Sequence, residues 1–167
     1  EPGHPMNGRQ LAAFQSARNL WPHARASLAA TAGVYLGADY VLDEIRPGIG
    51  LYGGGPAPPA GRRLTPVLTL RAPILQTRRL EPGESVGYGA SFVADRARTV
   101  ATVGLGYADG FLRAASNRGY GVLRGERCPI LGRVSMDLIV LDMQRLDARP
   151  GEMVEFVGPA APLGEAA

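Results

Sequence analysis

The chain has no lysine, and all 18 of its basic residues are arginine. Any reaction that needs a lysine amine must therefore take that amine from outside this chain. The only cysteine is Cys128, which excludes an internal disulfide framework and gives no support to a secreted protein. No apolar run approaches the roughly 18 residues that a membrane-spanning helix needs. We therefore expect a cytoplasmic protein without a membrane segment.

The charge of the chain is small and spread along the sequence. The formal net charge is +3, and the arginines occur at most in pairs such as Arg62–Arg63, so we expect no nucleic-acid partner. Hydrophobic residues make up 46% of the sequence and charged residues 20%, which is typical of a folded globular protein. The first residue is Glu1, and no targeting-peptide pattern follows it. We therefore expect the chain to be a segment of a longer protein.

The first part of the chain predicts helix and strand in alternation. Apolar residues at helical spacing predict an amphipathic helix that Asn7 caps and Pro22 ends. We expect a strand over residues 24–31, a helical turn over 32–36 and a second strand over 41–45 that leads into a turn. This order is typical of α/β units with a parallel sheet.

The composition changes from residue 53 onward. Residues 53–61 read GGGPAPPAG, which excludes a regular element and predicts a linker or surface loop. The remainder is rich in Val, Leu, Ile and Thr, with turn signals such as Pro82–Gly83 and Pro150–Gly151. It predicts an all-β domain with strands over residues 64–80, 98–107, 120–124, 127–143 and 152–157. The expected fold class is therefore α/β followed by all-β.

Several tyrosines stand next to glycines, among them Tyr52, Tyr88 and Tyr107. A flanking glycine lets the backbone turn sharply and lets a ligand approach, so that the phenol can project into a cleft. The alternative is a tyrosine at a surface turn with its hydroxyl in water. The pattern alone leaves both interpretations open.

Two further segments combine glycine with polar groups. In Arg46–Ile49 a proline fixes the chain and a glycine opens it. Backbone N–H groups there either face an anion such as a phosphate or form only a turn. Residues 132–137 place the Met136 backbone and the Asp137 side chain where a strand can bend, and the alternative there is a kink in an edge strand.

The other reactive residue types predict no site. His4 and His23 lie beside prolines and share no metal-ligand spacing with each other or with Cys128, so we expect no metal centre. Cys128 precedes a proline in an apolar strand and is expected in the core. The acidic residues from Asp142 to Glu152 follow a strand at irregular intervals and are expected to be solvated.

Five segments together carry a resemblance to a known family. They are SLAATAG at 27–33, RPGI and LYG within 46–53, SVGYG at 85–89, GYADG at 106–110 and GRVSMD at 132–137. In this order and at these distances they resemble the alanine racemase family over nearly the whole chain. The resemblance implies that residues 1–62 are the last part of a pyridoxal-phosphate-binding (β/α)8 barrel. Residues 63–167 would be a C-terminal β domain of barrel-like form, truncated at its end.

The resemblance also implies a reaction. The family uses pyridoxal phosphate to interconvert L-alanine and D-alanine and so supplies D-alanine for peptidoglycan. Tyr88 would move the α-proton on one face of the substrate and a lysine would move it on the other. Two bases are needed, because a single base returns the proton to the face it came from. Since a free tyrosine has a pKa of about 10, this role needs a positive charge or hydrogen-bond donors beside Tyr88.

Binding roles follow from the same resemblance. Thr31 and the N–H groups of Gly48 and Ile49 would hold the cofactor phosphate. Arg46 would contact the pyridine nitrogen, which stays unprotonated because a guanidinium keeps its proton. The residues expected to line the entrance or meet the substrate carboxylate are Tyr107, Arg113 and the backbone of Met136. Each site would combine the barrel of one subunit with the β domain of another, so a homodimer is expected.

The sequence departs from the family pattern near the cofactor. The family's cofactor lysine lies in the first part of the barrel, outside this chain, so the chain alone is expected to be inactive. Ala30–Thr31 stands where many members have Asn-Ser, and Ser27 stands where some have His. The family's last segment, with a further tyrosine, is not seen after Gly164. Two alternatives stay open: an amino-acid racemase of broader range, and a non-catalytic β-domain relic that dimerises or binds a partner.

Overall fold

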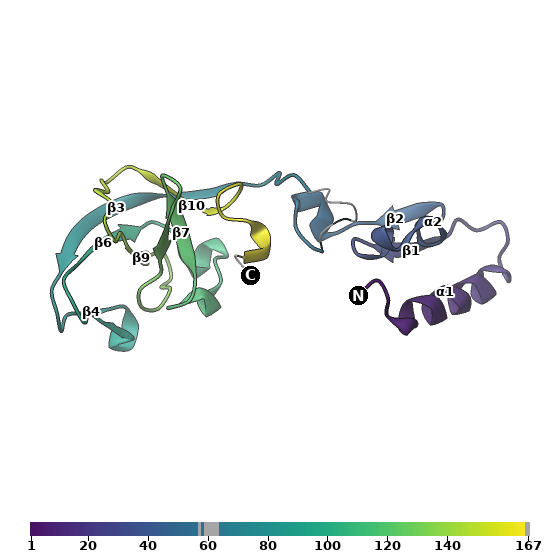
Figure 1. Ribbon diagram of the computed structural model, residues 1–167, viewed down its shortest axis with the longest axis horizontal. Helices are drawn as coiled ribbons and strands as arrows, with labels where there is room; N and C mark the ends of the chain where they lie inside the picture. The colour runs from purple at the N-terminus through teal and green to yellow at the C-terminus, as the bar shows by residue number, and fades with distance from the viewer. Residues whose placement is uncertain (57, 59–63, 166–167) are drawn as a thin grey trace. The chain divides into compact units, whose positions relative to one another are not determined.

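A computed structural model describes residues 1–56, 58 and 64–165 of the chain. It contains two compact units, an N-terminal unit (Glu1–Val67) and a β unit (Leu68–Ala167), and Figure 1 labels several of their helices and strands. Part of the expected linker and the expected domain boundary between residues 62 and 63 lie outside the described residues. Within the described part, no helix is long and apolar enough to span a membrane.

The N-terminal unit consists of short elements around one parallel strand pair. They are α1 (Pro5–Arg18), β1 (Ser27–Ala30), the 3-10 helix η1 (Gly33–Leu36), α2 (Ala38–Val41), β2 (Glu44–Arg46) and the 3-10 helix η2 (Ile49–Tyr52). β1 and β2 run parallel, with Ser27 opposite Glu44 and Ala30 opposite Arg46. The α/β pattern that the sequence predicts for this region is confirmed.

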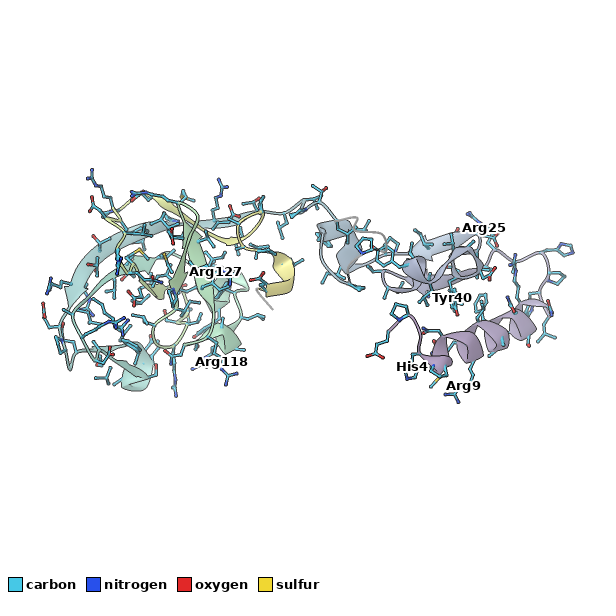
Figure 2. All side chains as sticks on the ribbon, in the orientation of Figure 1. His4, Arg9, Arg25, Tyr40, Arg118 and Arg127 are labelled. Carbon is cyan, nitrogen blue, oxygen red and sulfur yellow. The ribbon has the colours of Figure 1, made fainter. Side chains whose placement is uncertain are left out.

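Three local predictions in this unit are wrong. Helix α1 ends at Arg18 with Asn19 as its C-cap, so Pro22 is not the residue that ends it. Helix α1 begins before Asn7, because Nδ1 of His4 accepts a hydrogen bond of 3.1 Å from the backbone N–H of Met6 and caps the helix (His4 is labelled in Figure 2). Pro5 occupies the first turn, where its missing N–H has no intrahelical partner to lose. Val41 ends helix α2 instead of beginning a strand.

The β unit is built on one antiparallel sheet with the strand order β8-β7-β10-β3-β6-β9. Its strands are β3 (Leu70–Leu80), β6 (Arg98–Val103), β7 (Tyr120–Leu123), β8 (Glu126–Pro129), β9 (Ile139–Asp142) and β10 (Met153–Val157). A bridge between Ile130, just after β8, and Leu141 in β9 joins the two ends of this order. The sheet is therefore nearly closed, as expected for a barrel-like β domain. A separate pair is formed by β4 (Ser85–Val86) and β5 (Phe92–Val93).

The interior of the β unit is mainly apolar. Its largest fully buried side chains are those of Phe156, Ile74, Leu80, Ile139, Leu141 and Met143. Phe111 packs edge-on against Phe156 with ring centroids 5.3 Å apart. Burial raises the pKa of the Cys128 thiol to about 11, so this thiol stays protonated at neutral pH. The prediction of a core cysteine is confirmed.

Several predicted strands are too long. Residues 64–69 and 104–107 lie outside strands, so β3 begins at Leu70 and β6 ends at Val103. Residues 130–138 form a loop instead of continuing from β8 into β9. At the start of this loop Gly132 has a left-handed φ of 77°, which takes the backbone off an extended path.

Asp142 is also not the solvated charge that its spacing suggested. The residue is buried, its carboxylate pairs with the guanidinium of Arg98, and it accepts a 2.9 Å hydrogen bond from the N–H of Gln144. Arg98 pairs with Asp95 at 2.6 Å as well, and hydrogen bonds to these two carboxylates raise the pKa of Arg98. The sequence spacing did not indicate this pairing, because Arg98 comes from the neighbouring strand β6.

Candidate functional site

The predicted phosphate-binding residues meet at the carboxyl ends of β1 and β2. Thr31 follows β1, and Gly48 comes shortly after β2; because the strands are parallel, both residues lie at the same edge of the pair. The Thr31 hydroxyl accepts hydrogen bonds from the backbone N–H groups of Gly48 at 2.9 Å and of Gly50 at 3.2 Å. One buried residue therefore joins the two loops.

These two hydrogen bonds determine which further hydrogen bond the Thr31 hydroxyl can make. A hydroxyl has two lone pairs and one hydrogen, and here both lone pairs receive a backbone N–H. The hydrogen is left to donate, which suits an anionic acceptor such as a phosphate oxygen. A Cβ on Gly50 would stand 2.8 Å from Cγ2 of Thr31, so a larger residue at position 50 would push Thr31 out of place.

Arg46 is the last residue of β2, and its side chain is held by β1. Its Nη1 donates to the carbonyl and to the hydroxyl of Ser27, both at 2.7 Å, and its Nη2 donates to the carbonyl of Leu28 at 3.3 Å. A guanidinium has five N–H groups, so two are left without an acceptor among the described residues. Ser27 therefore holds the Arg46 side chain against β1.

Tyr88 begins the 3-10 helix η3 (Tyr88–Ala90) of the β unit and is 66% exposed. Gly87 and Gly89 have φ angles of 79° and 70°, so the sharp turn predicted from the flanking glycines is confirmed. A Cβ on Gly87 would stand 2.8 Å from the backbone nitrogen of Arg133, and one on Gly89 would stand 3.9 Å from Nη1 of the same residue. A positive group therefore lies beside the Tyr88 turn.

Tyr107 and Met136 lie on segments whose backbones are in contact. The N–H of Tyr107 donates to the Ser135 carbonyl at 3.0 Å, and the N–H of Ala108 donates to the Met136 carbonyl at 2.9 Å. Gly106 permits this approach, because a Cβ there would collide with the Met136 carbonyl. Both side chains are exposed, at 41% for Tyr107 and 52% for Met136. The structure therefore brings these two predicted residues together.

Met136 lies at the tip of a tight turn. The N–H and the hydroxyl of Ser135 donate to the Leu138 carbonyl at 3.0 and 2.7 Å, and the N–H of Leu138 donates to the Ser135 hydroxyl at 3.1 Å. None of these three bonds uses the N–H of Met136. The turn therefore leaves that N–H for an acceptor such as a carboxylate.

Arg113 belongs to the same surface. It begins the 3-10 helix η5 (Arg113–Ala115), and its guanidinium carbon lies 5.7 Å from the centroid of the Tyr107 ring. This distance is within the range of a cation–π contact. Tyr107, Arg113 and Met136 thus form one exposed cluster, and the Tyr88 turn contacts the loop that carries Met136.

The histidines take no part in these two groups of residues. His4 caps α1 and His23 is exposed. Among residues 1–56, 58 and 64–165, no group of three or more His, Cys, Asp or Glu side chains is placed to hold a metal ion.

Two family models match the chain. Residues 1–56 match the alanine racemase N-terminal domain, and residues 67–167 match the alanine racemase C-terminal domain. The chain belongs to the alanine racemase family. The sequence resemblance is therefore confirmed, and the two units correspond to parts of two domains of this family.

Named relatives cover nearly all of this racemase-family chain. It is 48% identical to the alanine racemase of Rhodospirillum rubrum over 162 residues. This aligned region covers 95% of this chain and 43% of that protein. It is 44% identical over 170 residues to the catabolic alanine racemase of Mesorhizobium japonicum, covering 100% of this chain and 44% of the relative. The chain thus spans less than half the length of the curated relatives it matches.

Solved alanine racemases have the same fold. The enzyme of Bartonella henselae, solved with covalently bound pyridoxal phosphate, matches with a TM-score of 0.89 and 40% identity, over 99% of this chain and 47% of that one. The biosynthetic alanine racemase of Pseudomonas aeruginosa matches with a TM-score of 0.87 and 37% identity, over 99% and 47%. The predicted fold, the last part of a (β/α)8 barrel followed by a barrel-like β domain, is confirmed.

Sequence reasoning missed three residues that support these racemase-family segments. Gly50 leaves room for the Thr31 side chain. Its only sequence signal is that a second glycine follows Gly48 two residues later. Ser135 closes the Met136 turn with a hydroxyl that both donates and accepts. Asn117 belongs to none of the predicted sites, although its side chain bonds to two other segments.

Proposed function

We propose that the chain is the C-terminal part of an alanine racemase, which uses pyridoxal phosphate to interconvert L-alanine and D-alanine. Residues 1–62 are the end of its cofactor-binding barrel and residues 63–167 are its C-terminal β domain. The observation that carries this proposal is the anion site of Thr31 beside the oriented Arg46, in a chain 48% identical to a protein named alanine racemase.

The N-terminal unit fits both polar ends of pyridoxal phosphate. The free O–H of Thr31 and the N–H of Ile49 are donors for the phosphate, and Gly48 supports them through its bond to Thr31. Arg46 offers its remaining N–H groups to the pyridine nitrogen, and this nitrogen stays unprotonated because a guanidinium keeps its proton. When bound, the cofactor withdraws electrons from the α-carbon of the amino acid and so acidifies its hydrogen.

Tyr88 is the proposed base on the L-alanine face. It takes the α-proton from L-alanine, or returns it, through its phenol oxygen, and the exposed turn of η3 leaves that oxygen accessible. A change of configuration needs a second base on the opposite face. The chain has no lysine, so the second base and the covalent attachment of the cofactor come from outside residues 1–167.

Tyr107, Arg113 and Met136 are the proposed substrate-contact residues. Tyr107 and Arg113 line the entrance, and the free N–H of Met136 binds the carboxylate of alanine. We infer a homodimer in which the β domain of one subunit completes the site on the barrel of the other. The exposure of Tyr88, Tyr107 and Met136 in the chain supports this arrangement, because a functioning site must shield these groups from water.

The biological setting follows from the same proposal. D-alanine is a building block of peptidoglycan, so the product serves the cell wall. A cytoplasmic location is supported by the single cysteine, which is buried and unpaired.

The absent lysine favours a second candidate for the chain by itself, a non-catalytic relic of the β domain. A racemase of broader amino-acid range is the alternative within the family. It differs from an alanine racemase in what the entrance beside Tyr107 and Arg113 admits.

The test joins the chain to the parts of the Rhodospirillum rubrum relative that precede and follow the matched region. We expect the joined protein, given pyridoxal phosphate, to show the visible absorbance of lysine-bound cofactor and to racemise alanine. The 167-residue chain alone should do neither, with its N-terminal amine chemically blocked as the control. A joined protein that binds the cofactor but leaves alanine unchanged contradicts the proposal, and equal rates on alanine and larger amino acids favour the broader racemase.

A further inference from the structure

Three turns of the β unit carry Tyr88, Arg113 and Met136, which the proposed function uses. Tyr88 lies on η3, Arg113 lies on η5 and Met136 lies in the loop of residues 132–137. None of these turns belongs to the six-stranded sheet. Other bonds must therefore fix their positions relative to one another.

Asn117 links the Tyr88 turn to the start of the Met136 loop. Its Nδ2 donates to the carbonyl of Ser91, the residue that follows η3, at 3.2 Å. Its Oδ1 accepts from the N–H of Gly132 at 2.6 Å, and its own backbone N–H donates to the Gly132 carbonyl at 3.2 Å. One side chain thus spans two segments that lie far apart in the sequence.

The backbone of Asn117 explains why this residue type stands here. Its φ is 56°, in the left-handed region that asparagine tolerates better than most other side chains. An amide also supplies one donor and one acceptor at the same time, which the carbonyl of Ser91 and the N–H of Gly132 require. Glycine would tolerate the left-handed φ but would supply neither the donor nor the acceptor. Aspartate would supply the acceptor but not the donor.

Ser116 adds the third turn to the same junction. Its hydroxyl donates to the Arg113 carbonyl at 2.6 Å and accepts from the N–H of Val134 at 3.0 Å. Two consecutive residues therefore contact η3, η5 and the loop of residues 132–137.

The backbones that Asn117 joins are also in direct contact. A Cβ on Gly132 would stand 2.7 Å from the Val86 carbonyl oxygen, and a Cβ on Gly87 would stand 2.8 Å from the Arg133 nitrogen. Contact of this kind fixes how close two segments lie but not how they are turned. Hydrogen bonds are directional, so the Asn117 amide supplies the missing orientation.

We propose that Asn117 is a positioning residue for the racemase reaction, because it sets the orientation of the Tyr88 turn relative to the Met136 loop. The proposal rests on the proposed function for the roles of Tyr88 and Met136. The junction itself is a property of the chain and can be tested without activity.

Three substitutions separate the parts of this proposal. Asn117→Gly keeps the left-handed backbone and removes both side-chain bonds. Asn117→Asp keeps the acceptor for the Gly132 N–H but sets a carboxylate oxygen against the Ser91 carbonyl. Arg118→Ala is the matched control, since Arg118 is the exposed next residue (Figure 2). Asn117 is itself exposed, so its replacement opens no cavity in the core.

The readout is nuclear magnetic resonance of the full 167-residue chain. With Asn117→Gly we expect the Gly132 amide to exchange with solvent about fivefold faster, as for the loss of one hydrogen bond, and the Tyr88 ring and Met136 methyl signals to move. Asn117→Asp should move the Tyr88 signals and leave the Gly132 amide protected. Arg118→Ala should change none of these signals.

Three results overturn the proposal, two from the resonance signals and one from the kinetics. In one, Asn117→Gly speeds exchange at Gly132 but leaves the Tyr88 and Met136 signals in place. In the other, signals shift throughout the β unit, as for a residue that only stabilises the fold. In the joined racemase we expect Asn117→Gly to lower kcat about tenfold with little change in KM, and equal kcat values also overturn it. If the joined protein with Asn117 intact does not racemise alanine, the proposed function fails, and the resonance result still decides the role of Asn117.

Discussion

The two units differ in how they are held together. The β unit buries large side chains such as Phe156 and Leu141 inside a nearly closed sheet. Among the described residues of the N-terminal unit, the buried side chains are small: Ala26, Ala29 and Thr31. The unit that carries the proposed cofactor residues therefore lacks the kind of core that the unit carrying Tyr88 possesses.

The same contrast appears on the surfaces. In the N-terminal unit the large apolar side chains of Leu20, Trp21 and Leu51 are exposed, at 70%, 63% and 62%. Within the part of this unit that the structure describes, the sheet is one pair of parallel strands, an arrangement that is normally covered on both faces. Its polar site is nevertheless ordered by local bonds around Thr31 and Arg46. Binding groups can thus be set by a few hydrogen bonds, whereas stability needs buried apolar area.

The largest expected effect is a core truncation in the β unit. Phe156→Ala should destabilise this unit by about 3–5 kcal/mol, since it removes a fully buried ring that packs against Phe111. Leu51→Ala in the N-terminal unit should change its stability by less than about 0.5 kcal/mol, because Leu51 is exposed. Urea unfolding followed by near-ultraviolet circular dichroism measures both. Equal losses of stability for the two variants would contradict the difference described between the two units.

A smaller effect is expected where the site meets the core. Gly106→Ala should cost about 1–3 kcal/mol, because the added Cβ collides with the Met136 carbonyl and must displace that turn. Gly3→Ala is the control in the other unit, where an added Cβ meets nothing within 4 Å. The midpoint of thermal unfolding reports both changes. An unchanged midpoint for Gly106→Ala would mean that the Met136 turn moves freely over the core.

Acid should reduce the free energy of unfolding of the β unit. The pKa of Glu155 lies below its usual value, first because its carboxylate accepts the N–H of Ala160 and further because it pairs with Arg71. A lowered folded-state pKa means that this stabilisation is complete above the usual glutamate pKa of about 4.3 and is lost as the pH falls through the folded value.

Glu155→Gln should therefore flatten the fall in stability of the β unit below about pH 4.3. Glu126→Gln, at an exposed position of β8, serves as the control and should leave the fall unchanged. Unfolding curves recorded from pH 7 downward make the comparison. The same acid slope with and without Glu155 would show that its bonds give no pH-dependent stability.

The smallest effect should be a gain in the N-terminal unit. Gly8 lies inside α1, and a Cβ there meets nothing within 4 Å. Gly8→Ala should stabilise the helix by about 0.5–1 kcal/mol, because alanine loses less conformational entropy in a helix. Amide exchange within α1 should slow while exchange in β3 stays the same. Slower exchange in both units would mean that they unfold as one.

Sequence patterns predicted the parts of this fold that depend on local order. The pattern of apolar residues predicts the helix before Pro22 and the strands of the parallel pair β1 and β2. The flanking glycines predict the sharp turn at Tyr88. The pairing of Arg98 with Asp142 and the span of Asn117 from Ser91 to Gly132 could not be predicted in this way. Each joins residues that only the folded sheet brings together, and a single sequence carries no signal for such partners.

The central claim is that the chain carries one of the two bases of an alanine racemase. The most direct measurement is the exchange of the α-hydrogen of each alanine enantiomer with deuterated water, catalysed by the joined protein with and without Tyr88→Phe. Tyr120→Phe is the matched control, since the Tyr120 hydroxyl bonds to Glu165 instead. The account predicts that Tyr88→Phe slows exchange from L-alanine far more than exchange from D-alanine. Equal loss for both enantiomers, or no loss for either, would contradict it.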